Sequence, residues 1–129
     1  MLSEAQDVPR THAALAFRAY GVAKSGRSQR EQEAEVFAIL AARLRAAIRD
    51  AAPMSAIRAA ADAHRVFVTV ESIVLDPVST LPRDLRLNIA SVARRAVKEA
   101  NSDKPDLDFL AAIAEDFAAG LGARQRTDR

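Results

Sequence analysis

The chain of 129 residues has no cysteine, no tryptophan and only four glycines, and aromatic residues make up just 5% of it. Without cysteine there is no disulfide framework, no thiolate metal site and no cysteine nucleophile. No apolar run approaches the roughly 20 residues that a membrane-spanning helix needs. Residues 1–10 carry Glu4 and Asp7 and lack an apolar signal core. We therefore expect a cytoplasmic protein.

Alanine is what the chain has in abundance, with 29 residues. It is the strongest helix former, because it loses no side-chain entropy in a helix. β-Branched residues are few and scattered, apart from the stretch 66–74, where a local strand is an alternative to helix. A chain of this length forms one domain by default. The composition predicts a single all-α domain with a core of Leu, Ile, Val and Ala.

Apolar residues at helical spacing predict a small bundle of four main helices plus a short N-terminal helix. The short helix covers about residues 11–22, and the main helices cover about 29–51, 54–75, 82–100 and 107–122. We expect residues 1–10 to be a disordered N-terminus, residues 11–122 to be the single helical domain and residues 123–129 to be a disordered tail.

Local signals set these boundaries. Ser28 and Glu31 have the spacing of a capping box. Pro53 ends one helix and starts the next, and Pro82 suits a first helical turn. Asp106 can cap the last helix, and two glycines near its end suit a C-cap: Gly120 and Gly122.

The helix over 82–100 is expected to turn one row of side chains inward: Leu85, Ile89, Val92 and Ala96. The last helix repeats apolar residues at spacing close to a heptad seam: Leu107, Leu110, Ala114, Phe117 and Leu121. The helix over 54–75 has more apolar surface than one face requires, which predicts that part of it contacts other helices or a partner.

No set of residues converges on a chemical reaction. The two histidines, His12 and His64, lie far apart in the sequence, and no glycine loop follows a strand. The carboxylates at Glu31, Glu33 and Glu35 suit a helix N-terminus, where the macrodipole favours negative charge. We expect no enzyme activity, no metal and no cofactor.

Arginine outnumbers lysine, and Arg94, Arg95 and Lys98 form a basic patch, yet the net charge is only +2. RNA-binding surfaces interleave aromatic residues with basic ones for base stacking, and none lies near this patch in the sequence. A solvated helix face is the favoured interpretation, and nucleic acid is not an expected partner.

Residues 81–92, LPRDLRLNIASV, resemble the LP-x-x-LR-x-N-hydrophobic-x-S signature of the FlaF family of flagellar biosynthesis regulators. Further segments are similar to the family in order and spacing across residues 13–121. They are AFRAY at 16–20, REQEA at 30–34, Val66-Phe67 in place of Leu-Trp, Asp76-Pro77, and AAGL at 118–121. Three positions depart from the family pattern, with Ala63 and Ala114 in place of asparagines and Phe67 in place of tryptophan. If those asparagines contact the partner, partner choice differs here.

The resemblance implies a small, non-enzymatic, cytoplasmic protein that binds newly made flagellin as an export chaperone and, with or against FlbT, controls flagellin translation. A helical bundle with an apolar groove can hold a terminal flagellin segment by helix-in-groove packing. Our candidate groove residues are Phe67, Val70, Val74, Leu85, Arg86 and Ile89. A second candidate surface is Phe17 and Tyr20 on the short first helix, which could instead fold back into the groove.

Two other functions stay open. The arginine patch motivates an RNA-level regulator that contacts the flagellin transcript, and the seam on the last helix motivates a helical oligomerisation module.

Overall fold

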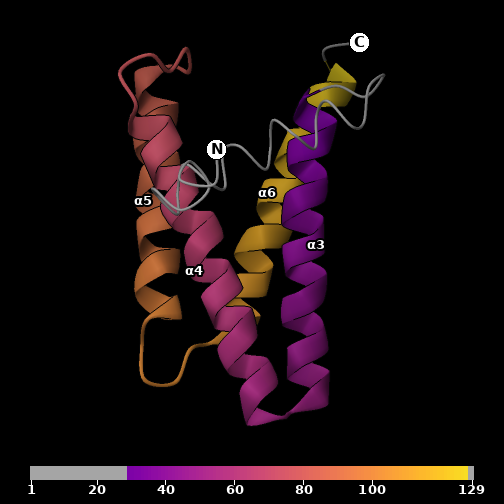
Figure 1. The fold of residues 1–129 in the computed structure, drawn as a ribbon. Helices are drawn as coiled ribbons and strands as arrows, with labels where there is room; N and C mark the ends of the chain where they lie inside the picture. The colour runs from indigo at the N-terminus through magenta and orange to yellow at the C-terminus, as the bar shows by residue number, and fades with distance from the viewer. Residues whose placement is uncertain (1–28, 128–129) are drawn as a thin grey trace, which may run out of the picture.

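Four helices joined by short loops make up residues 29–127, the part of the chain that the computed structural model describes (Figure 1). They are α3 (Gln29–Asp50), α4 (Pro53–Leu75), α5 (Arg83–Ala100) and α6 (Leu107–Thr127). Residues 29–127 contain no strand, and residues 66–74 lie within α4. The all-α fold is therefore confirmed. The short helix expected over 11–22, the Ser28 cap and residues 1–10 lie outside the described residues.

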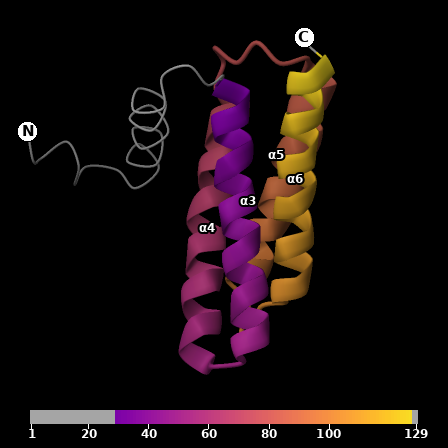
Figure 2. The ribbon, with the colours of Figure 1, turned by 90° about the vertical axis from the view of Figure 1, so that its right-hand side faces the viewer.

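Successive helices run in opposite directions and associate as two pairs, α3 with α6 and α4 with α5 (Figures 1 and 2). Contacts within each pair are extensive, while those between the pairs are sparse. The pairs meet at the end that carries the α3–α4 turn and the α5–α6 loop, and they diverge toward the other end in Figure 1. We call these the closed end and the open end of the bundle.

The α3–α4 turn is built around Ala51, whose φ is +60°. Its N–H donates to the carbonyl of Ala47 at 3.0 Å, which closes the last turn of α3 in a left-handed C-cap. Ala52 is extended, as a residue before proline prefers, and Pro53 opens α4, where its missing N–H is not needed. This places α4 directly against α3 after only two linking residues.

The loop from α5 to α6 is organised by two carboxylates. Glu99 accepts a hydrogen bond from the backbone N–H of Asp106 at 2.8 Å. Asp106 in turn accepts one from the N–H of Phe109 at 3.0 Å, so its predicted role as the cap of this helix is confirmed. The α4–α5 loop has a similar turn, where the Asp76 carboxylate accepts from the Val78 N–H at 2.9 Å.

The predicted C-terminal end of the last helix is wrong. Gly120 and Gly122 do not end it, because α6 continues through both to Thr127 and overlaps the expected tail. A glycine inside a helix lowers stability by about 1 kcal/mol without forbidding the helix. Gly120 is exposed and no heavy atom lies within 4 Å of the position that a Cβ would occupy, so packing does not require glycine there.

Three phenylalanines form the centre of the core. Phe37 of α3 and Phe117 of α6 have ring centroids 5.1 Å apart. Phe67 of α4 lies against both, at 6.2 Å from Phe37 and at 5.6 Å, edge to face, from Phe117. These distances suit favourable aromatic pairing. Phe67 therefore joins one helix pair to the other.

The prediction for the inward face of α5 is only partly right. Ala96 is fully buried and Ile89 packs against the core, but Leu85 and Val92 are exposed. The buried row is made of alanines instead: Ala90, Ala93, Ala96 and Ala100. Small side chains let two helix backbones approach closely, and α5 uses this row to lie against α4. Ile48 of α3 and Ile57 of α4 are also exposed, near the closed end.

Replacing Ala51 with glycine should stabilise the protein. Glycine adopts a positive φ without the steric penalty that alanine has, so Ala51→Gly should raise the free energy of unfolding by about 1 kcal/mol. Ala61→Gly, at an exposed position inside α4, is the matched control and should lower it by about 1 kcal/mol. Urea titration followed by circular dichroism measures both, and a loss of stability in Ala51→Gly would contradict the turn geometry.

Truncating Phe67 should be among the most damaging single changes in the core. Phe67→Ala removes a fully buried ring that touches two other rings, and should lower the free energy of unfolding by about 3–5 kcal/mol. Phe109→Ala makes the same change at a half-buried site and should lower it clearly less. Equal losses in the two variants would show that Phe67 does not hold the pairs together.

Candidate partner-binding surface

The N-terminal half of α5 displays an uncovered apolar row, which we call the α5 stripe: Leu85, Ile89 and Val92. These residues recur at i, i+4 and i+7 and therefore lie on one helix face. Leu85 is 37% exposed and Val92 is 38% exposed, with Ile89 half-buried between them. One step further along the same row, Ala96 is completely buried. The row thus loses its cover as it approaches the open end.

The side of α5 that faces α4 is closed. Ala90 and Ala93 are buried, and Arg94 donates from Nε to the Glu71 carboxylate of α4 at 2.9 Å. The contact along this seam extends over most of both helices (Figure 1). A partner cannot approach α5 from the α4 side without separating this pair.

The side of α5 toward α6 is covered only near the loop that joins them. There the guanidinium of Arg95 lies over the Phe109 ring, 5.9 Å from its centroid, within the range of a cation–π contact. Beyond this point α5 and α6 contact each other little and diverge in Figure 1. The α5 stripe lies in this uncovered half.

The candidate groove residues on α4 belong to the core. Phe67 has no exposed surface, and Val70 and Val74 are also buried. A partner could touch them only after the two helix pairs separate. Phe67 is enclosed because its ring packs against Phe37 and Phe117.

The candidates on α5 are accessible. Leu85 and Ile89 form two-thirds of the α5 stripe, and Arg86 is half-buried beside them, with an Nε that has no hydrogen-bond partner among the described residues. Val92 was not among the candidates, although its spacing from Leu85 and Ile89 was visible in the sequence. The second candidate surface, Phe17 and Tyr20, lies outside the described residues.

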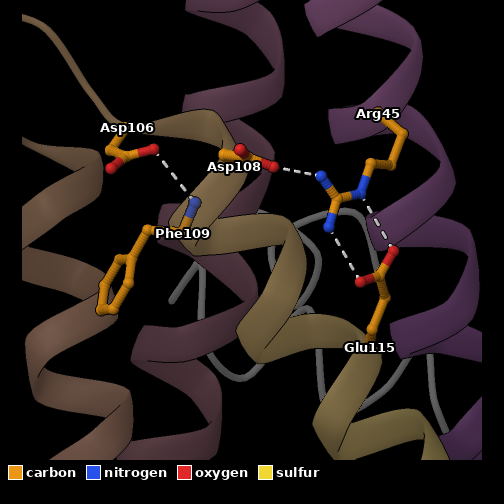
Figure 3. Close-up of polar contacts among 5 residues, drawn as sticks. All are labelled: Arg45, Asp106, Asp108, Phe109 and Glu115. Atoms are coloured by element: carbon orange, nitrogen blue, oxygen red, sulfur yellow. Dashed lines mark hydrogen bonds and ion pairs between the residues drawn. The ribbon is translucent and has the colours of Figure 1, made fainter.

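Polar contacts across the α3–α6 pair centre on Arg45 (Figure 3). Its guanidinium binds Glu115 through two parallel hydrogen bonds of 3.0 and 2.9 Å, and it also pairs with Asp108. The hydrogen bonds from Arg45 lower the pKa of Glu115, and those to Glu115 and then Asp108 raise the pKa of Arg45. We call this group the Arg45 clamp.

Other arginines are also paired with carboxylates. Arg43 of α3 lies 3.8 Å from Asp62 of α4, which also pairs with Arg65 on its own helix. With Arg94 of α5 bound to Glu71, paired arginines lie on three helices, and their charges are offset by neighbouring acids.

An open pocket of about 470 Å³ lies along the C-terminal part of α4, lined by Val68, Glu71, Ser72, Leu75, Asp76 and Pro77. Its lining has no basic group that would hold an anion. Across residues 29–127, no three histidine or acidic side chains gather closely enough to hold a metal ion. None of the helices in this range is long and apolar enough to cross a bilayer.

A family model described as flagellar protein FlaF matches residues 16–121, which is most of the chain. The chain belongs to the FlaF family. No match was found among curated proteins or among solved structures. Membership makes this a flagellar protein, and the matched region contains α3, α4, α5 and α6 as far as Leu121.

The three departures from the FlaF pattern all lie in the core. Ala63, Phe67 and Ala114 each have no exposed surface. An asparagine at either alanine position would be buried and would need a polar partner inside the bundle. In this FlaF-family chain these residues set how α4 packs between α3 and α6, so their effect on a partner would pass through the shape of the bundle.

The Arg45 clamp should make stability depend on pH. Because the folded pKa of Glu115 is lowered, its contribution is present above the unfolded value of about 4.3 and is lost as pH falls through the folded value. Glu115→Gln should therefore be less stable than wild type near pH 7, and the difference should be smaller at pH 3, which lies below the unfolded value. Urea unfolding at both pH values tests this.

Asp116→Asn is the matched control, since Asp116 is an exposed neighbour without an ion pair among the described residues. It should leave stability nearly unchanged at pH 7. A Glu115→Gln deficit as large at pH 3 as at pH 7 would mean that the clamp acts through something other than the charge of Glu115.

Proposed function

We propose that this FlaF-family protein is a cytoplasmic, non-enzymatic export chaperone that binds a terminal segment of newly made flagellin on the α5 stripe. Through this binding it modulates flagellin synthesis, with or against FlbT. The observation that carries the proposal is the stripe itself, an apolar row that is buried at Ala96 and uncovered at Val92 and Leu85.

The physics of the stripe suits a helical client. An amphipathic helix recognises a partner through apolar residues at i, i+3, i+4 and i+7, which is the spacing that α5 presents. A flagellin terminal segment that is unfolded before assembly would become ordered on this surface and be kept from premature assembly. Ordering a disordered segment costs several kcal/mol of the gross interaction energy, which keeps the complex reversible.

The RNA-level alternative has less support. The patch of Arg94, Arg95 and Lys98 on α5 motivates it, but Arg94 pairs with Glu71. Arg43 and Arg45 of α3 also pair with carboxylates in the described region. Phosphate binding would have to break these pairs. A protein partner with an apolar face is the better match to the α5 stripe.

The oligomerisation alternative was based on the apolar seam of α6, and this seam is not exposed for a second copy of the chain. The seam on α6 faces its own bundle, where Leu110 and Ala114 are buried and the other members pack against the core: Leu107, Phe117 and Leu121. This seam is therefore already used within one chain.

A charged residue on the α5 stripe should weaken flagellin binding. Val92 is partly exposed, so Val92→Lys should keep the fold, which circular dichroism can verify. It should reduce affinity for flagellin by about tenfold, since burying a valine contributes about 1.5 kcal/mol and a factor of ten corresponds to 1.4 kcal/mol. Co-purification and isothermal titration with the flagellins of the same genome measure the change.

Ile57→Lys is the matched control, because Ile57 is an apolar residue that is 61% exposed on α4, away from the stripe. It should bind flagellin as wild type does. A folded wild-type protein that binds no flagellin, or a Val92→Lys variant that binds as well as Ile57→Lys, would overturn the proposal.

A further inference from the structure

Arg86 lies at the inner edge of the α5 stripe and has no partner for its charge. We propose that Arg86 pairs with a carboxylate of the helical segment that binds on the stripe, so that the site takes amphipathic segments with an acidic residue beside their apolar face. The identity of the client rests on the proposed function, whereas the unpaired state of Arg86 is a property of the protein without a client.

Helical spacing fixes the position of Arg86 relative to the stripe. It precedes Ile89 by three residues, so the two side chains are neighbours on the surface of α5. Four and seven residues further on, the same side of the helix carries Ala90 and Ala93, which are buried. Arg86 is therefore the charged member of an otherwise small and apolar face, near the open end of the bundle (Figure 1).

The guanidinium of Arg86 lacks an acceptor. Its Nε is buried and makes no hydrogen bond. Ion pairs within residues 29–127 involve other arginines and do not include Arg86: Arg43, Arg45, Arg65 and Arg94. Buried N–H groups are nearly always paired in folded proteins, and a guanidinium keeps its charge at any accessible pH. The half-buried side chain thus presents a cation and a donor that the described region does not satisfy.

Arg86 is also poorly placed for stabilising the free protein. It lies in the first turn of α5, where the helix macrodipole disfavours a positive charge. Its buried, unpaired Nε adds the desolvation penalty of a donor that has lost water without gaining an acceptor. A carboxylate supplied by a partner removes both penalties, which points to a role in binding.

The complement of this surface is an amphipathic helix with a carboxylate. Residues three or four positions apart share one face of a helix, so an Asp or Glu one turn from an apolar residue can reach Arg86 while that residue contacts Ile89. A carboxylate can accept two parallel hydrogen bonds from a guanidinium, as Glu115 does from Arg45 in this protein. The apolar stripe supplies contact area, and the charge pair selects the client and fixes its register.

The free protein provides the first test. Arg86→Met keeps the length of the side chain and removes its charge and its unpaired donor. It should raise the urea midpoint of unfolding by about 0.5 M. Arg83→Met, at an exposed position in the same turn, is the matched control and should change the midpoint less. An unchanged or lowered midpoint for Arg86→Met would show that the fold already uses the guanidinium, and would overturn the proposal whether or not flagellin binds.

The pairing itself is tested with synthetic peptides of the terminal segments of flagellins from the same genome. Each Asp or Glu is replaced singly by Asn or Gln, and binding is measured by isothermal titration. One such replacement should weaken binding to the wild-type protein by about tenfold, and Arg86→Gln should weaken binding of the original peptide by a similar factor. The two changes together should be scarcely worse than either alone, which is the sign of a direct contact.

Arg83→Gln makes the same change of charge at the exposed neighbouring position, and its effect should add to that of every peptide substitution. If Arg86→Gln binds the peptides as well as wild type does, or its effect adds at every acidic position, the pairing is refuted and the proposed function stands. Peptides that fail to bind the wild-type protein would refute the proposed function as well, so the two failures are distinguishable.

Discussion

The contact of Phe67 with Phe37 and Phe117 is the interaction that holds the two helix pairs together. Each pair has its own means of association. The α3–α6 pair has buried apolar residues from both helices, among them Leu44 and Leu110, with the Arg45 clamp at its surface, and the α4–α5 pair has the alanine seam. Between the pairs, contacts are sparse, and the edge-to-face rings occupy the middle of the bundle. Because this contact is central and not continuous, the pairs can be joined without closing along their full length.

Side-chain size explains the direction in which the bundle opens. Large rings separate α4 from α3 and α6, while alanines draw α5 close to α4. Because α5 packs closely against α4, it does not also pack along α6, which packs against α3. The α5 row that is buried at Ala96 is therefore uncovered at Val92 and Leu85. The same packing that stabilises the pairs leaves the apolar stripe exposed.

Much of the architecture could be predicted from the sequence because its signals are local. Pro53 and Asp106 mark helix starts through steric and hydrogen-bonding rules that need no tertiary information. The face of α5 could not be predicted in the same way, since alanine suits both a buried seam and a solvated surface. Periodicity identified Leu85, Ile89 and Val92 as one row, but whether a neighbouring helix covers that row is decided by residues on α4 and α6.

Exposure of the candidate binding residues could not be predicted from the sequence either. The apolar residues on several sides of α4 indicated that Phe67 could bind a partner. The positions of Phe37 and Phe117, on two other helices, show that its ring is enclosed. A stripe of three partly exposed side chains is small enough to be tolerated in water and large enough to matter on binding. Such a surface suits the proposed role of holding a client and then releasing it. A fully exposed row would favour aggregation, and a fully buried one would require the core to open at every cycle.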